Sequence, residues 1–225
     1  ALLPMRSTMP PISSVAWTSF LTGVNPGRHG IYGFMERKPE SFDIYFPNSH
    51  HIQSPTVWQI LEPHGKRCVV INVPNTYPAR PMPGVLIAGF VAVDLKRAVH
   101  PPAILPRLQA MDYRIDVDCR RAADEKTAFF DDLFLTLERR REAILHFLAT
   151  EAWDLFIGVF TESDRLHHYF WDEYENGHGR YHASFLKFYR RLDEIIGEIL
   201  SRAGDEVELI MLSDHGFCAL ESEVY

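Results

Sequence analysis

Three short runs of apolar, mostly β-branched residues constrain the fold of this 225-residue chain more than any other feature. They are RCVVINV (67–73), WDLFIGVF (153–160) and VELIMLS (207–213), and each is bounded by polar or turn residues. Runs that are apolar at nearly every position are typical of parallel strands covered on both faces, because a strand with one wet face alternates instead. We therefore predict that all three are buried strands of a mostly parallel sheet.

Helical patterns alternate with these runs. In SPTVWQILEPHG we expect a helix with Ser54 at its N-cap, Pro55 in its first turn and Gly65 at its end. Apolar residues at helical spacing predict two longer helices, at about 124–150 and 181–203. Strands that alternate with helices form βαβ units, so the expected fold class is α/β with an open sheet.

The length suits one large α/β domain or two small ones, and we expect residues 1–225 to form a single domain. Residues 35–53 are rich in Pro, His and aromatic residues and show little periodicity. A stretch of this kind in a compact domain is often functional, so we expect an excursion over the sheet edge that serves as a cap facing the substrate.

Composition excludes several classes of protein. A net charge of −7 and a pI of about 5.9 argue against a nucleic-acid polymer as partner, which would require a basic stripe. A phosphate substrate stays compatible, because bound cations would then be the largest local charges. The sequence contains no run of 18 apolar residues, so we expect no membrane-spanning helix. The three cysteines, Cys68, Cys119 and Cys218, form no disulfide pattern, so we expect a reducing, cytoplasmic location.

The segment TESDRLHHYF (161–170) follows the second apolar run and places Asp164 four residues before His168. If Asp164 lies near the start of a helix, both side chains share one face and can reach one divalent ion. The alternative is that Asp164 only caps the helix and that His168 packs beside Tyr169. His167 is a rival ligand, because i, i+3 and i, i+4 spacings both lie near one face.

A second acidic-histidine pair, Asp214 and His215, follows the third run and precedes Gly216. Adjacent residues in a turn can both bind one ion, and glycine allows the backbone to bend close to it. Because ligands bind beyond the carboxyl ends of the strands in open α/β sheets, we expect this pair and the Asp164–His168 pair at one sheet edge.

The other histidines have weaker claims. His50 and His51 lie in the irregular stretch without an acidic neighbour, so we expect them at the surface or in the cap. His29 lies in the glycine-rich turn GRHGIYGF, where a structural role through hydrogen bonds to the loop backbone is expected.

The segment MPPISSVAWTSFLTG (9–23) predicts a helix from about Ser14 that ends at Gly23. Ser13 would then be the N-cap, beside free backbone N–H groups and the positive end of the helix dipole. That is an anion site, where its hydroxyl would meet a phosphoryl group. The alternative is a plain capping serine.

Together these segments resemble the alkaline phosphatase superfamily, and most closely its type I phosphodiesterase/nucleotide pyrophosphatase branch. That branch has a Thr or Ser nucleophile nine residues before Thr-Gly and a following P-x-x-H-G turn, similar to SSVAWTSFLTGVNPGRHGI with Ser13. Its D-x-x-x-H motif resembles Asp164 and His168, and its S-D-H-G motif resembles the segment 213–216.

The resemblance implies a three-layer αβα fold and a metal-dependent hydrolase of small phosphate esters, with Ser13 as catalytic nucleophile. It implies two divalent ions, usually zinc, with manganese as the other candidate. One ion would be held by Asp164, His168 and a later His, and the other by an early Asp, Ser13, Asp214 and His215. The ions would activate the hydroxyl and clamp the attacking and leaving oxygens.

The sequence departs from this branch at three positions. No Asp precedes Ser13, and no His follows Gly216, so we expect that the chain is truncated at both ends and that each metal site lacks one ligand. Phe34 stands where the branch carries an Asn that holds a phosphate oxygen, and Arg37 or Lys38 is the expected substitute.

Two other functions compete with this hypothesis. A sulfatase or phosphomutase is disfavoured, because the C-x-P-S-R signature is absent and no cysteine lies near Ser13. A catalytically incomplete fragment, or a non-catalytic binding module with the same fold, is the alternative that the missing ligands favour. The sequence contains no G-x-S-x-G elbow and no Walker loop, so neither motif indicates another kind of hydrolase.

Overall fold

In this computed structural model the described residues are 3–119 and 125–220, and they form two compact units. Unit 1 contains the described residues of 1–107, 151–159 and 212–215. Unit 2 contains those of 108–150, 160–211 and 216–225. The single domain expected over residues 1–225 stays a prediction.

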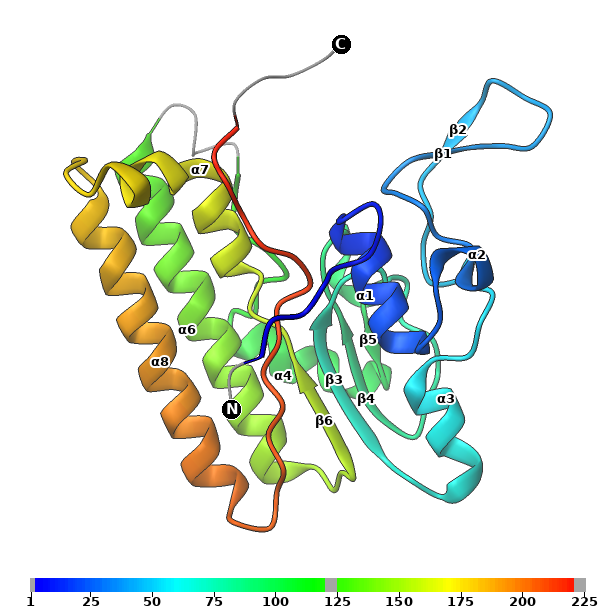
Figure 1. The fold of residues 1–225 in the computed structure, drawn as a ribbon. Helices are drawn as coiled ribbons and strands as arrows, with labels where there is room; N and C mark the ends of the chain where they lie inside the picture. The colour runs from blue at the N-terminus through cyan, green and yellow to red at the C-terminus, as the bar shows by residue number, and fades with distance from the viewer. Residues whose placement is uncertain (1–2, 120–124, 221–225) are drawn as a thin grey trace. The chain divides into compact units, whose positions relative to one another are not determined.

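Unit 1 combines a sheet with short helices (Figure 1). Its elements are α1 (Ser13–Thr22), α2 (Pro26–His29), β1 (Glu36–Arg37), β2 (Ile44–Tyr45), α3 (Val57–Leu61), η1 (Glu62–His64), β3 (Cys68–Val73), β4 (Gly84–Ala88), η2 (Leu95–Arg97), β5 (Val99–His100), η3 (Pro102–Ile104) and β6 (Leu155–Gly158). Helix α4 (Leu105–Ala110) includes residues of both units.

The main sheet has the strand order β5-β4-β3-β6. Strand β3 pairs in parallel with β4 on one side and with β6 on the other, so that Val70 lies opposite both Leu86 and Ile157. Only β5 runs antiparallel to its neighbour. Every residue of β3 is buried. The prediction of a mostly parallel sheet around the run 67–73 is therefore confirmed.

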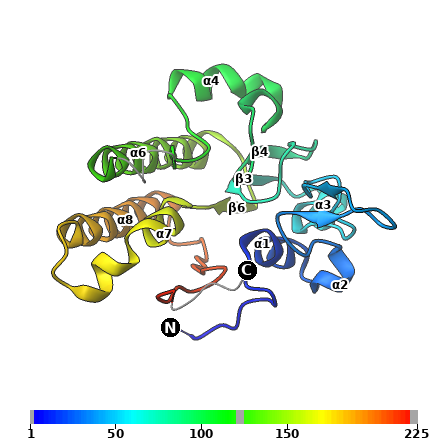
Figure 2. The same ribbon diagram turned by 90° about the horizontal axis from the view of Figure 1, so that it is seen from above.

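Helices α1 and α3 cover one face of this sheet (Figure 2). Trp17 and Leu21 of α1 and Trp58 of α3 pack in one cluster with Val70 and Leu86. Burying a side chain such as valine or leucine contributes roughly 1.5–3 kcal/mol. This packing fixes α1 on the sheet and thereby fixes the place of Ser13 at its first turn.

The start of α1 differs by one residue from the prediction. The N-cap is Ile12, in an extended conformation and without a side-chain cap, and Ser13 is the first helical residue. The predicted end is confirmed, because Gly23 adopts a left-handed conformation (φ 67°) and donates its N–H to Ser19 O at 2.8 Å. The Ser13 hydroxyl is consequently not used as a cap.

The predictions of Ser54 as N-cap of the next helix and of Pro55 in its first turn are both wrong, because both residues precede the N-cap. Helix α3 starts after Thr56, whose capping box with Gln59 satisfies the first amides, with Thr56 N donating to Gln59 Oε1 at 2.9 Å. Ser54 Oγ instead donates to Arg28 O at 3.0 Å. The helical segment ends at Gly65 as predicted, through the single turn η1.

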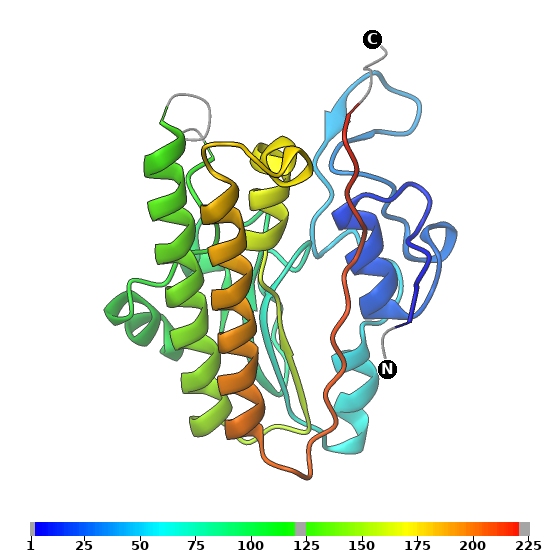
Figure 3. The same ribbon diagram turned by 60° about the vertical axis from the view of Figure 1, so that its left-hand side comes forward.

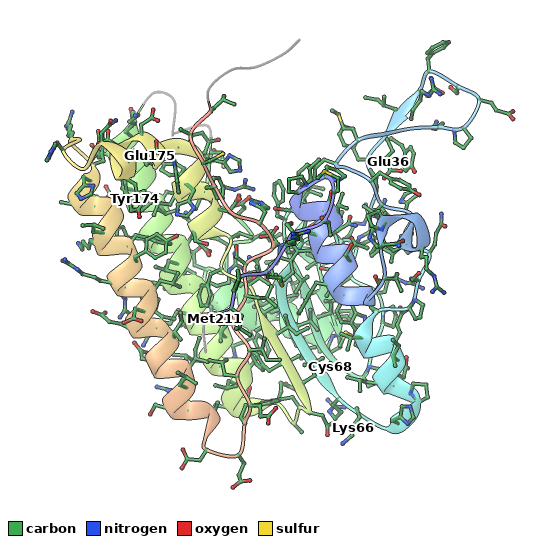
Figure 4. The ribbon with its side chains drawn as sticks, in the orientation of Figure 1. Glu36, Lys66, Cys68, Tyr174, Glu175 and Met211 are labelled. Carbon is green, nitrogen blue, oxygen red and sulfur yellow. The ribbon has the colours of Figure 1, made fainter. Side chains whose placement is uncertain are left out.

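The run 207–213 is not the buried strand that its composition predicts. It forms no regular structure, and Ile210 in its middle is 81% exposed. Figure 3 shows this segment as an extended trace, and Figure 4 labels Met211 on it. An apolar run becomes a strand only where a neighbouring strand accepts its hydrogen bonds, and β6 pairs with β3 alone among the described strands. Strand β6 is also only half-buried.

Within its described residues, unit 2 contains three packed helices, α6 (Lys126–Thr150), α7 (Glu162–Asn176) and α8 (His182–Ala203), besides the end of α4. The predicted helices at 124–150 and 181–203 are confirmed to within two residues, although residue 124 itself lies outside the described part. Figure 3 shows these helices side by side. Their shared core is aromatic and aliphatic: Phe129, Phe130, Leu133, Leu137, Leu166, Phe170, Phe185, Phe188 and Ile195.

The excursion 35–53 contains an antiparallel hairpin of β1 and β2, with Glu36 opposite Tyr45. The hairpin extends away from the rest of unit 1 (Figure 1). Its role as a cap stays a prediction, as does the three-layer arrangement of the fold. Among the described residues, no helix is both long and apolar enough to cross a membrane.

We expect opposite results from the same substitution in β3 and in the C-terminal run. Ile71→Ala should lower the free energy of unfolding by about 2–5 kcal/mol, because it leaves a cavity at a fully buried position. Ile210→Ala should change it by about 0.5 kcal/mol or less, because that side chain is exposed. Urea unfolding measures both. A large loss for Ile210→Ala would restore the prediction of a buried strand at 207–213.

Candidate functional site

Asp164 and His168 lie on the first two turns of α7. The helix begins at Glu162 after Thr161 as N-cap, so Asp164 is its third residue and His168 its seventh. Asp164 Oδ1 and His168 Nε2 are 3.4 Å apart, and the His168 side chain is 55% exposed. The two groups share one helix face as predicted, and the reading of Asp164 as the N-cap is wrong because Thr161 holds that position.

The structure separates His167 from His168, which the spacing could not do. His167 Nε2 lies 2.7 Å from Tyr189 Oη, and its ring stacks on Phe185 with centroids 5.5 Å apart. Both partners come from α8. His167 therefore belongs to the aromatic packing between α7 and α8, whereas His168 faces Asp164.

Ser13 and His215 meet in unit 1, although 202 positions separate them. Ser13 Oγ lies 3.0 Å from His215 Nε2, and that nitrogen lies 3.6 Å from Asp214 Oδ2. Leu212 anchors this stretch, because it packs against the cluster that also holds α1 on the sheet. Ser7 adds a second link, since its hydroxyl donates to Asp214 O at 2.5 Å.

Ser13 and Ser14 point to different surroundings. Ser13 is half-buried and faces His215, whereas Ser14 is buried, with a hydroxyl that has no hydrogen-bond partner within the described residues. The first bonded amides of α1 are those of Val15 and Ala16, which both donate to Ile12 O at 2.9 Å. The amides of Ser13 and Ser14 precede this bonded turn, which is where a helix receives an anion.

Taken in pairs, these side chains have the chemistry and the spacing of two ligands of one divalent cation. Two ligands of a tetrahedral zinc ion, each at about 2.0–2.1 Å from the metal, are roughly 3.3 Å apart. The separations of Ser13 Oγ and Asp214 Oδ2 from His215 Nε2 are 3.0 and 3.6 Å, and that of Asp164 from His168 is 3.4 Å.

The Asp214 carboxylate gives a further indication. Its Oδ2 is buried and accepts no hydrogen bond from any described residue. A buried carboxylate oxygen without a donor is costly unless a cation binds it. Within residues 3–119 and 125–220, however, no three His, Cys, Asp or Glu side chains gather closely enough to hold an ion. Asp214 and His215 therefore reach three ligands only with Ser13, and Asp164 and His168 reach three only with a further ligand.

The two pairs belong to different units, with Asp164 and His168 in unit 2 and Asp214 and His215 in unit 1. Their convergence at one sheet edge stays a prediction. The roles of Ser13 as nucleophile and of all five residues as metal ligands are likewise predictions.

Two ion pairs at the start of α7 could not be predicted from the sequence. Arg140 of α6 and Glu162 are both fully buried, with Nη2 and Oε1 3.3 Å apart, and burial raises the pKa of Glu162 although Arg140 opposes this. Arg165 Nε lies 3.1 Å from both carboxylate oxygens of Asp116. Arg140 stands in the sequence ERRRE, which is typical of a solvated helix face, so only tertiary packing reveals its burial.

The remaining candidates lie outside this group. His50 is exposed, and His51 receives the N–H of Asn48 at 3.1 Å within its own turn. Arg37 lies over the Phe42 ring at 5.8 Å, and Lys38 pairs with Asp43 at 3.7 Å. Both cations thus interact within the hairpin region, and their contact with a phosphate stays a prediction.

His29 has the structural role predicted for it. Its Nδ1 accepts the N–H of Ile31 at 3.1 Å, and its Nε2 lies 2.9 Å from Ser19 Oγ. The ring is therefore neutral, and it ties the turn after α2 to α1. Burial lowers the pKa of His29 below 6.5, although Glu36 opposes this shift.

The comparisons with known proteins identify a family. A family model described as type I phosphodiesterase/nucleotide pyrophosphatase matches residues 2–225. No curated protein and no solved structure matches the chain.

The buried His29 should make stability depend on pH. Its folded-state pKa lies below its unfolded value, so below about pH 6.5 the unfolded chain binds a proton that the folded chain does not. The free energy of unfolding should therefore fall as the pH drops through 6.5. His29→Gln should reduce this dependence, as measured by urea unfolding at several pH values. The matched control is the exposed His64→Gln, and equal slopes in both variants would contradict this role for His29.

Proposed function

Because the chain belongs to the type I phosphodiesterase/nucleotide pyrophosphatase family, we propose that it hydrolyses small phosphate esters with Ser13 as the nucleophile and two divalent cations as cofactors. The family supports a hydrolase of this general type and is generally metal-dependent. The observation that carries the proposal is the 3.0 Å approach of Ser13 Oγ to His215 Nε2, beside Asp214, whose carboxylate Oδ2 is buried.

The proposed ligands fall into two sets. Ser13, Asp214 and His215 would hold one ion, and Asp164 and His168 would contribute to the other. Zinc suits the mixture of carboxylate and imidazole ligands, and manganese is the second candidate. When bound, such ions lower the pKa of a coordinated hydroxyl and neutralise charge on the phosphoryl group.

The chain's own residues would then carry out a two-step transfer. Ser13 loses its hydroxyl proton to water, and its oxygen forms a bond to phosphorus. The bond from phosphorus to the leaving-group oxygen breaks, and that oxygen departs with the bonding electrons and takes up a proton from water. The amides of Ser13 and Ser14 at the start of α1 are placed to hold a phosphate oxygen. Water next attacks the phosphoserine, breaks its O–P bond and restores the Ser13 hydroxyl.

The alternative proposal is a binding module that keeps the fold and a partial site without turnover. It rests on the count of close ligands among the described residues. Asp164 and His168 are only two, and Asp214 and His215 reach three only with Ser13. A chain that binds zinc and inorganic phosphate but hydrolyses no diester would favour this alternative.

Substitution of the two adjacent serines should identify the nucleophile. Ser13→Ala should lower kcat for an aryl phosphodiester by about 10³-fold or more, because a nucleophile has no substitute. Ser14→Ala should retain activity within about threefold, because its hydroxyl is buried away from His215. Colour released from a bis-nitrophenyl phosphate measures both variants. Equal losses would show that the nucleophile has been misassigned.

Metal removal should abolish the same activity. Dialysis against a chelator should reduce turnover to background, and zinc or manganese should restore it. Asp214→Asn and Asp164→Asn should each weaken zinc binding by about 10-fold or more, because a neutral amide replaces a carboxylate ligand. Asp205→Asn, at an exposed position, serves as the control. Unchanged zinc affinity in both site variants would refute the assigned ligands.

A further inference from the structure

The first turn of α7 lacks the usual side-chain cap. Its N-cap Thr161 makes no side-chain hydrogen bond to the helix amides. The first backbone bond of this turn runs from Arg165 N to Thr161 O at 3.1 Å. Helix ends without caps tend to fray. Asp164 lies inside this turn, so contacts that hold the turn in place also orient its carboxylate.

One support is a fully buried ion pair. Glu162, the first residue of α7, places its Oε1 3.3 Å from both Nε and Nη2 of Arg140. Arg140 also donates to Ile115 O at 2.7 Å and to the hydroxyl of Tyr113, whose pKa burial raises to about 12. A single guanidinium therefore joins α6, the segment 113–115 and the start of α7.

Asp116, which follows the segment 113–115, binds α7 at a second point, one turn after Glu162. Asp116 accepts two hydrogen bonds at 3.1 Å from Arg165 Nε and one at 2.5 Å from Arg165 Nη2. Arg165 Nη1 reaches Asp164 Oδ2 at 3.4 Å. The residues before and after Asp164 are thus both tied to groups outside α7.

We propose that Glu162, through Arg140, and Asp116, through Arg165, are positioning residues that fix the Asp164 carboxylate beside His168 for metal binding. The inference rests on the proposed function, because it takes Asp164 and His168 as ligands. Ligand geometry tolerates displacements of only about 0.5 Å. Groups that orient a ligand from outside commonly control metal affinity by about 10–100-fold.

Four variants separate positioning from stability. Glu162→Ala and Asp116→Ala each remove one support. Glu162→Gln removes the same charge as Glu162→Ala but keeps an oxygen that can accept from Arg140. Glu198→Ala is the matched control, because Glu198 of α8 pairs with Arg141, the neighbour of Arg140 on α6, at 2.8 Å and leaves α7 untouched.

Two readouts on the full chain test the proposal. Cobalt(II) titration, followed by d–d absorption, gives the metal affinity, and amide exchange at Arg165 reports the first turn of α7 without metal. Glu162→Ala and Asp116→Ala should each weaken cobalt binding and accelerate Arg165 exchange by about 10-fold, relative to the amides of α8. Glu162→Gln should stay within about threefold of the wild type, and Glu198→Ala within about twofold.

Other results would overturn the proposal. The proposal is overturned if the Arg165 amide exchanges at the wild-type rate in Glu162→Ala and Asp116→Ala. It is also overturned if Glu198→Ala changes cobalt affinity and Arg165 exchange as much as these two variants do. Equal losses in Glu162→Gln and Glu162→Ala would assign the effect to charge instead of position. If Glu162→Ala fails to fold, Asp116→Ala still tests the proposal, because the ion pair of Asp116 with Arg165 is partly exposed. Wild-type cobalt binding by Asp164→Asn would refute the metal site of the proposed function, and the exchange readout would still decide whether the turn is held.

Discussion

The parallel pairing of β3 on both of its edges is the interaction on which unit 1 depends. Because β3 is buried along its whole length, its neighbours β4 and β6 are aligned with it, and α1 packs on the face that they form. The same apolar cluster receives Leu212, two residues before Asp214. Packing on one central strand therefore accounts for a contact between Ser13 and His215 that spans almost the whole chain.

Local pattern was sufficient where a residue's environment follows from its neighbours in sequence. The continuous apolar run 67–73 predicted a central strand, and helical spacing predicted α6 and α8. Gly23 and Gly65 ended their helical segments as expected, because each adopts a left-handed conformation that glycine accepts easily. The i, i+4 spacing likewise placed Asp164 and His168 on one face.

Sequence pattern failed to predict the structure where a residue's environment depends on a partner distant in sequence. The run 207–213 is apolar enough for a strand but pairs with no described strand, so composition alone mispredicted it. His167 and His168 could not be ranked from spacing, because Tyr189 and Phe185 of α8 decide which of them faces Asp164. Arg140 looked solvated in a run of charges, yet it is fully buried against Glu162. Each case depends on tertiary contacts that no local window contains.

The central proposal is that Ser13, Asp214 and His215, together with Asp164 and His168, would hold the cations of a phosphate-ester hydrolase. The most direct measurement is anomalous diffraction at the zinc edge from zinc-soaked crystals of the protein. The account predicts two peaks about 4 Å apart, one at Ser13, Asp214 and His215 and the other at Asp164 and His168. Peaks at His167 or at His50 and His51, or two peaks far apart, would contradict it.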